Sequence, residues 1–128
     1  MREILFRGKR LDNGAWETGS LVIVRMDCHD AQYYIADKMT GYHTPVDSST
    51  VGQYTGLTDK NGKRIFEGDI AKVLQGKDKD IAYVGFENGA FMLYPKTGNI
   101  YERTLWEYWY NDWDVEVIGN ITDNPELL

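Results

Sequence analysis

The segment VGQYTGLTDKNGKRIFEGDIAKV, residues 51–73, holds the densest turn and strand signals in the chain. Asn61 and Gly62 stand between two runs of strand-forming residues, and Asn-Gly is the strongest local signal for a β-hairpin. The pair is favoured because a two-residue type I′ turn needs a positive φ at both positions. Apolar alternation resumes at Ile70, so we predict a hairpin here, followed by the opening strand of a β-barrel.

Similar turn signals lie on both sides of this segment. Asn13-Gly14 turns a short apolar run back into Trp16, and Asn88-Gly89 separates two runs of β-branched and aromatic residues. Three Asn-Gly turns in one small chain favour an antiparallel meander or barrel. We predict an all-β fold, or a β-dominated α+β fold, with one short C-terminal helix.

The length of the chain suits one domain, because 128 residues can bury an adequate core without disulfides. We expect residues 1–128 to form a single domain with two subregions. Residues 1–49 are predicted to be an N-terminal hairpin subregion, and residues 50–128 a barrel subregion. A segment rich in turn-forming residues, 38–49, ends the first of them.

The composition excludes several classes of function. Hydrophobic residues make up 42% of the chain and aromatic residues 13%, which is enough to build a core and excludes a disordered chain. Acidic residues outnumber basic ones by 20 to 14, and the net charge of -6 opposes general attraction to phosphate backbones. The single cysteine, Cys28, cannot form an internal disulfide, and no apolar run approaches the length of a membrane span. We expect a cytoplasmic protein with no membrane role.

No motif carries a complete catalytic or metal-binding pattern. Residues 56–64 resemble a phosphate loop only superficially, because the glycine spacing is wrong and Arg64 replaces the required hydroxyl. Asp27-Cys28-His29-Asp30 gathers potential metal ligands, but adjacent side chains diverge and seldom reach one ion together. A nucleophilic Cys28 assisted by His43 has no third residue to orient it. We predict no enzymatic activity and no catalytic, cofactor-binding or metal-binding residues. The metal site at Asp27-Cys28-His29-Asp30 and the Cys28 nucleophile with His43 are the alternatives.

A basic and aromatic cluster near the central hairpin is the candidate nucleic-acid surface. Its members are Tyr54, Lys60, Lys63 and Arg64. In proteins that bind single strands, cations contact phosphates and aromatic rings stack on bases. Solubilising charge at a hairpin tip explains the same residues, and the acidic net charge favours this second interpretation.

Aromatic residues are concentrated between Leu105 and Trp113. Their spacing predicts a short amphipathic helix within residues 101–110, with Tyr108 and Trp109 near the surface. The segment is too short for one small core to cover every ring, so at least one ring should face outward. We predict a homo-oligomer interface at Tyr108, Trp109 and Trp113, with packing in the core as the alternative.

Three segments resemble the YopX family of phage and prophage proteins. They are Phe6-Arg7-Gly8-Lys9 with Trp16 and Gly19; residues 51–62 continuing into Glu67-Gly68-Asp69-Ile70; and residues 117–121 with 123–128. The resemblance spans almost the whole chain in the expected order. It implies a domain of uncharacterised function that has no accepted active site. Residues 67–73 also resemble the strand opening of SH3-like barrels, which implies such a barrel from about residue 50 onward.

Together these features predict a non-enzymatic phage or prophage accessory protein in the cytoplasm of a bacterial host. We expect it to act by binding protein, as a homo-oligomer with an unknown phage or host partner, and without a cofactor. A nucleic-acid-binding protein that uses the basic and aromatic surface is the alternative function.

Overall fold

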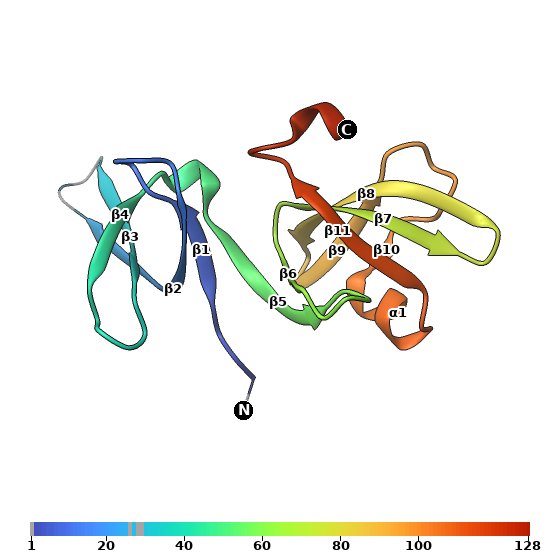
Figure 1. The fold of residues 1–128 in the computed structure, drawn as a ribbon, viewed down its shortest axis with the longest axis horizontal. Coiled ribbons are helices and arrows are strands. Elements are labelled where there is room, and N and C mark those ends of the chain that lie inside the picture. The colour runs from blue at the N-terminus through green and yellow to red at the C-terminus, as the bar shows by residue number, and fades with distance from the viewer. Residues whose placement is uncertain (1, 26, 28–29) are drawn as a thin grey trace. The chain divides into compact units, whose positions relative to one another are not determined.

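The computed structural model describes residues 2–25, 27 and 30–128. The chain divides into two compact units, Met1–Tyr54 and Thr55–Leu128, and strand β5 (Gly52–Thr58) contributes residues to both. Antiparallel strands dominate each unit, and one short helix lies late in the chain (Figure 1). These elements confirm the predicted all-β class with a single C-terminal helix. Within the described residues, no helix has the length and apolar character needed to cross a membrane.

The first unit is built on an antiparallel sheet in the order β4-β3-β2-β1-β5. Besides β5, the unit consists of β1 (Phe6–Lys9), β2 (Trp16–Arg25), β3 (Ala31–Ala36), β4 (His43–Val46) and the one-turn 3-10 helix η1 (Ser48–Thr50). The helix η1 begins after Asp47, whose carboxylate accepts a hydrogen bond from the N–H of Ser49 at 3.0 Å. The segment 38–49 therefore contains a short strand and a capped turn.

Close packing between β2 and β3 requires a glycine at position 19. Gly19 pairs with Phe6 of β1, and a Cβ at this position would lie 2.1 Å from the carbonyl oxygen of Ala36. That distance is far inside van der Waals contact, so any side chain would force the backbone to move. The buried hydrophobic residues of this unit include Leu5, Ile35 and Val46.

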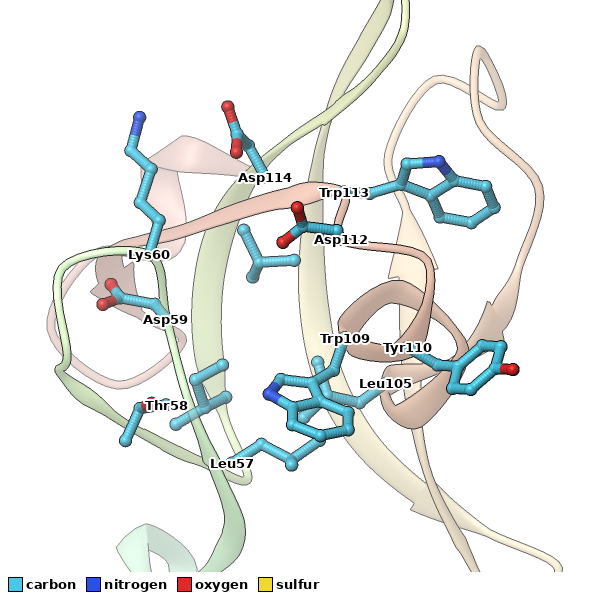
Figure 2. A pocket seen from close by; sticks show the side chains of 12 residues that line it. Leu57, Thr58, Asp59, Lys60, Leu105, Trp109, Tyr110, Asp112, Trp113 and Asp114 are labelled. Atoms are coloured by element: carbon cyan, nitrogen blue, oxygen red, sulfur yellow. The ribbon is translucent and has the colours of Figure 1, made fainter.

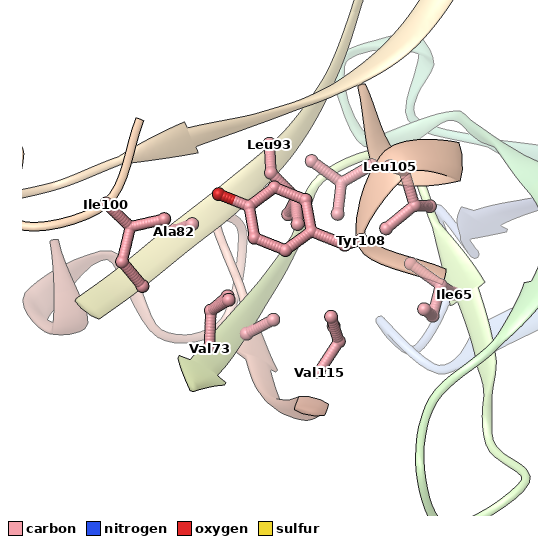
Figure 3. Packing of buried hydrophobic residues seen from close by; sticks show 10 residues of the cluster. Ile65, Val73, Ala82, Leu93, Ile100, Leu105, Tyr108 and Val115 are labelled. Carbon is pink, nitrogen blue, oxygen red and sulfur yellow. The ribbon is translucent and has the colours of Figure 1, made fainter. Parts of the chain in front are cut away.

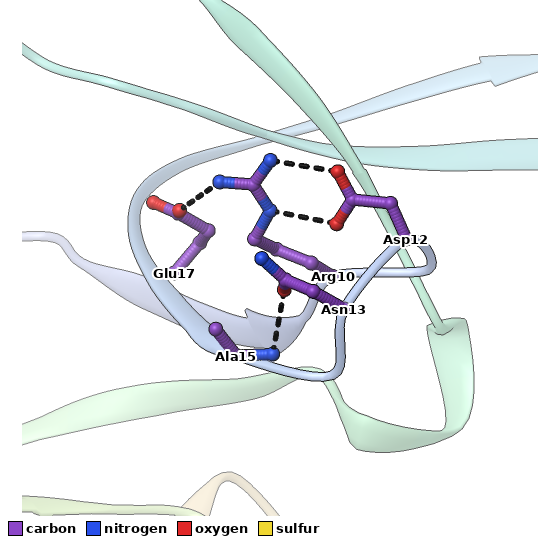
Figure 4. A network of polar contacts seen from close by, with 5 residues as sticks. All are labelled: Arg10, Asp12, Asn13, Ala15 and Glu17. Atoms are coloured by element: carbon purple, nitrogen blue, oxygen red, sulfur yellow. Dashed lines mark hydrogen bonds and ion pairs between the residues drawn. The ribbon is translucent and has the colours of Figure 1, made fainter.

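The first hairpin loop is held by an exposed arginine network, shown in Figure 4. The guanidinium of Arg10 donates two hydrogen bonds to the carboxylate of Asp12, at 2.8 and 2.9 Å, and a third to Glu17 at 3.1 Å. Because a guanidinium matches a carboxylate with two parallel hydrogen bonds, the loop acquires a defined geometry. The hydrogen bonds from Arg10 lower the pKa of Asp12. The charge of Arg10 is therefore neutralised within the loop.

The second unit contains an antiparallel sheet in the order β10-β9-β8-β7-β11, together with the hairpin of β5 and β6 (Figure 1). Its elements are β6 (Arg64–Phe66), β7 (Asp69–Gln75), β8 (Asp78–Glu87), β9 (Ala90–Pro95), β10 (Arg103–Thr104), α1 (Leu105–Tyr110), β11 (Asp114–Asn120) and the 3-10 helix η2 (Pro125–Leu127). An SH3-like barrel in this region stays a prediction.

The core of the second unit gathers one face of the sheet, the strand β6 and the inner face of α1, as Figure 3 shows. Alternate residues of β8, Ala82 and Val84, are buried, as expected for a half-buried strand. The other members are Ile65, Ala71, Val73, Leu93, Ile100, Leu105, Tyr108 and Val115. Each large aliphatic side chain here contributes about 1.5–3 kcal/mol through burial.

Only one of the Asn-Gly pairs forms the predicted two-residue turn. Asn88 and Gly89 have φ values of 52° and 81°, as a type I′ turn requires. At the central hairpin Gly62 has a positive φ of 80° but Asn61 does not, and the N–H of Asp59 donates to the carbonyl of Lys63. This is a three-residue loop with glycine in the left-handed position. The predicted hairpin is present, but its predicted turn type is wrong.

Candidate binding groove beside α1

A groove of about 590 Å³ lies in the second unit beside α1. The chain forms one side of it where β5 leads into the hairpin turn, and α1 with the start of β11 forms the other (Figure 2). Its lining combines aliphatic side chains with aromatic rings and charged groups. The aliphatic members are Leu57, Ile65, Leu105 and Val115. Because three of these also belong to the buried core, the groove has a firm apolar base.

The hairpin turn beside the groove is fixed by one buried carboxylate. Oδ1 of Asp59 accepts hydrogen bonds from the N–H groups of Asn61 and Lys63, both at 2.9 Å, and Oδ2 accepts one from Val117 at 2.9 Å. Burial opposes ionisation of Asp59, but these three donors outweigh it and hold its pKa below the ordinary value. The N–H of Lys60 also donates to the carbonyl of Val115 at 3.0 Å. The turn is therefore attached to β11 by hydrogen bonds, which fix the two sides of the groove to each other.

The helix α1 begins with a reciprocal cap. The side chain of Thr104 accepts a hydrogen bond from the N–H of Glu107 and donates one to its carboxylate, each at 3.2 Å. The carboxylate of Glu107 also accepts a hydrogen bond from the guanidinium of Arg103 at 3.1 Å. These contacts set the rotation of a helix of only six residues, and so determine which rings enter the core.

Tyr108 points into the core and is only 1% exposed, so its predicted place on the surface is wrong. Its hydroxyl donates to the carbonyl of Tyr101 at 2.8 Å, and its ring meets Trp113 edge-on at a centroid distance of 5.2 Å. Leu105, three residues earlier on the helix, is also buried, so these two residues define the inner face. Trp113 is half-buried through the same contact.

Trp109 is 56% exposed and borders the groove, where Figure 2 shows its ring beside Leu57 and Leu105. The prediction that at least one ring of this segment faces outward is therefore confirmed by Trp109. Two further outward rings lie on the adjoining face of α1, and the second of them also lines the groove: Trp106 and Tyr110 are 56% and 67% exposed and stack at a centroid distance of 4.9 Å. Their i, i+4 spacing is visible in the sequence, but the predicted interface did not include them.

Acidic side chains border the groove where α1 ends and β11 begins. Asp112 has a positive φ of 57°, a conformation that aspartate tolerates better than most residues, and Figure 2 shows its carboxylate directed into the groove. Asp114 is exposed two residues later. Lys60 lines the other side, but its ammonium lies 3.2 Å from the carboxylate of Glu116. Sequence patterns did not single out either aspartate, because only the fold brings them beside Trp109.

The predicted nucleic-acid residues fall in different surroundings. Lys63 and Arg64 are exposed on the central hairpin, while Lys60 is paired with Glu116 and lies among the carboxylates of the groove. Tyr54 is half-buried in β5 and belongs to the first unit, where its N–H donates to the carbonyl of Leu5 at 2.8 Å. The cluster predicted from sequence is thus divided between the two units.

The alternative metal and nucleophile sites involve Cys28 and His29, which lie outside the described residues. Of their neighbours, Asp27 accepts a hydrogen bond from the N–H of Asp30 at 2.9 Å. Nδ1 of His43 lies 2.7 Å from the carbonyl oxygen of Gly41, and its ring meets Tyr34 edge-on. Among the residues that the structure describes, no three His, Cys, Asp or Glu side chains are grouped to hold a metal ion.

Comparisons with known proteins relate the chain to one family and to solved structures of the same fold. The model of the family described as YopX protein matches residues 5–128. The crystal structure of protein yopX from Bacillus subtilis is 22% identical, with a TM-score of 0.60 and 97% coverage of both chains. That of protein EF1440 from Enterococcus faecalis is 23% identical, with a TM-score of 0.61, and covers 100% of this chain and 99% of its own. At these identities the two structures establish a shared fold. No curated protein matches the chain.

Proposed function

Because this chain belongs to the YopX protein family, we propose that it is a non-enzymatic phage or prophage accessory protein that acts by binding protein, including copies of itself. The proposal places it in the cytoplasm of a bacterial host. Its binding surface is the outer face of α1, formed by Trp106 and Tyr110. This pair replaces Tyr108 in the interface predicted from sequence, because Tyr108 is buried.

The observation that carries the proposal is the exposure of this stacked aromatic pair. Trp106 and Tyr110 expose more than half of their surface, although both are large rings that gain several kcal/mol on leaving water. Tryptophan and tyrosine are also the residues most enriched at the energetic centres of protein interfaces. A second copy is the favoured occupant, because symmetric self-association covers the same patch on both subunits.

The helix presents these rings in a fixed arrangement. The cap at Thr104 and the burial of Leu105 and Tyr108 hold α1 against the core, and the stacking contact holds the two rings against each other. A surface that is ordered before association loses little side-chain entropy when the complex forms. Such preorganisation favours specific binding to a partner.

Light scattering tests the self-association. At micromolar concentration the wild type should have an oligomeric mass, and Trp106→Ala with Tyr110→Ala should reduce it to the monomeric mass. The control is Tyr42→Ala, which removes a ring that is 71% exposed in the first unit and should leave the mass unchanged. A monomeric wild type, or an oligomer that survives the double substitution, would contradict the proposed interface.

Nucleic-acid binding is the second candidate, and the exposure of Lys63 and Arg64 on one hairpin supports it. Phosphate contacts make affinity fall steeply with salt, by close to one power of the salt concentration for each contact on duplex DNA. Titration of single-stranded DNA and RNA at several salt concentrations measures this slope. Binding with a steep slope that Lys63→Ala and Arg64→Ala abolish would favour this function over the first.

A further inference from the structure

We propose that the groove beside α1 binds an extended segment of a partner protein that carries an arginine next to an aliphatic residue. This inference rests on the proposed protein-binding function. It adds the chemistry of the partner segment that would bind in the groove. The groove adjoins the Trp106 and Tyr110 face. Trp109 and Tyr110 both line it, whereas Trp106 and the core residue Tyr108 do not.

The charge of the groove selects a cationic ligand. Three carboxylates, those of Asp59, Asp112 and Asp114, line it together with one ammonium, that of Lys60. The ammonium is already paired with Glu116, and the carboxylate of Asp59 is occupied by three backbone donors. Asp112 and Asp114 are the exposed carboxylates that remain to meet a positive charge. A phosphate backbone would be repelled by the same arrangement.

The aromatic and aliphatic parts of the lining favour arginine over lysine. Trp109 offers a half-exposed indole at the groove, and a guanidinium can stack on such a ring while its N–H groups reach a carboxylate. Asp112 lies on the same side of the groove, at the C-terminal end of α1 (Figure 2). The aliphatic base around Leu57 and Val115 then accepts the neighbouring apolar side chain of the ligand.

A short synthetic peptide tests this chemistry directly. The probe is acetyl-Gly-Leu-Arg-Leu-Gly-amide, and its matched control replaces arginine with citrulline, which has nearly the same shape but no charge. Binding is followed by NMR on ¹⁵N-labelled protein through the indole N–H of Trp109 and the backbone N–H of Asp112. We expect both signals to shift on titration with the arginine peptide, and the citrulline peptide to bind at least tenfold more weakly.

Substitutions in the protein complete the test. Asp112→Asn with Asp114→Asn removes two charges and keeps a residue that tolerates positive φ, so it should weaken peptide binding at least tenfold without unfolding the protein. Asp78→Asn removes an exposed carboxylate at the start of β8, outside the groove, and should leave the affinity unchanged. Equal binding of the two peptides, or unchanged affinity in the double variant, would overturn the inference.

The same samples separate this inference from the proposed self-association. Light scattering on Asp112→Asn with Asp114→Asn should give the wild-type mass, because these residues lie outside the Trp106 and Tyr110 face. A self-associating wild type that shows no shifts with the arginine peptide overturns the groove ligand alone. A monomeric wild type that binds the peptide supports the groove ligand and overturns only the self-association.

Discussion

The carboxylate of Asp59 accepts a hydrogen bond from the backbone N–H of Val117 at 2.9 Å, which links the central hairpin turn to a strand 58 residues later. The same carboxylate closes its own turn through the N–H groups of Asn61 and Lys63. One side chain therefore determines both the local loop and its attachment to β11. We expect much of the stability of the second unit to depend on it.

The first prediction concerns this carboxylate. Asp59→Ala leaves three backbone donors without their acceptor and should lower the free energy of unfolding by about 3 kcal/mol. Urea denaturation followed by tryptophan fluorescence measures the change. Asp78→Ala, at an exposed aspartate, serves as the control and should change stability by no more than about 0.5 kcal/mol. Similar midpoints for the two variants would show that the Asp59 contacts contribute little.

The second prediction concerns pH and rests on Asp80. This residue is buried, which opposes its ionisation, but the hydroxyl of Thr97 at 2.8 Å and the N–H groups of Ile81, Thr97 and Asn99 hold its pKa below the ordinary value. A lowered folded-state pKa contributes stability that is present above the unfolded value of about 3.9 and is lost as the pH falls through the folded value.

The difference in unfolding free energy between wild type and Asp80→Asn should therefore be largest near neutral pH and should narrow as the pH falls below about 4. Denaturation at a series of pH values measures it. A difference that stays constant from neutral pH to pH 2 would mean that ionisation of Asp80 does not stabilise the fold.

The third prediction uses the left-handed backbone at Gly62, where φ is 80°. Gly62→Val places a β-branched side chain in a conformation that costs about 1–2 kcal/mol for an L-residue. Its neighbour Lys63 is exposed, and Lys63→Ala keeps the backbone donor that binds Asp59. The melting temperature should fall clearly for the first variant and little for the second. Equal melting temperatures would refute the strained position.

The fourth prediction separates the two contributions of Tyr108. Tyr108→Phe removes the hydrogen bond to the carbonyl of Tyr101 and should cost about 1 kcal/mol. Tyr108→Ala also empties the core between Leu93 and Val115 and should cost about 3–5 kcal/mol. Chemical denaturation of both variants measures the difference. If the alanine variant is as stable as the phenylalanine variant, the ring does not fill the core as described.

The hairpins and the all-β class could be predicted from the sequence because turn residues and alternating apolar residues act locally. The type of the central turn could not, because it is set by Asp59, whose third hydrogen bond comes from Val117. At Asn61-Gly62 the local preference for a type I′ turn is outweighed by the three hydrogen bonds that Asp59 accepts, two from its own turn and one from Val117. At Asn88-Gly89, where the two strands continue directly from the turn, the local preference is realised.

The aromatic segment shows a different limit. Helical spacing in the sequence groups Trp106 with Tyr110 and Leu105 with Trp109, but it does not say which group enters the core. That choice follows from the cap at Thr104 and from the space left by the sheet, which Tyr108 fills. The groove could not be predicted for a similar reason, because Leu57 of β5 and Asp112, between α1 and β11, line one groove only in the folded chain.

The attachment of the hairpin turn to β11 also bears on aggregation. β11 is an outermost strand of its sheet, and a strand in that position offers unpaired amide and carbonyl groups on which another chain can assemble. Here the carbonyl of Val115 is taken by Lys60 and the N–H of Val117 by Asp59. With these groups occupied, a second copy cannot extend the sheet along this part of the strand. At this part of β11, any contact with another chain is therefore left to side chains, which can discriminate between partners as backbone pairing cannot.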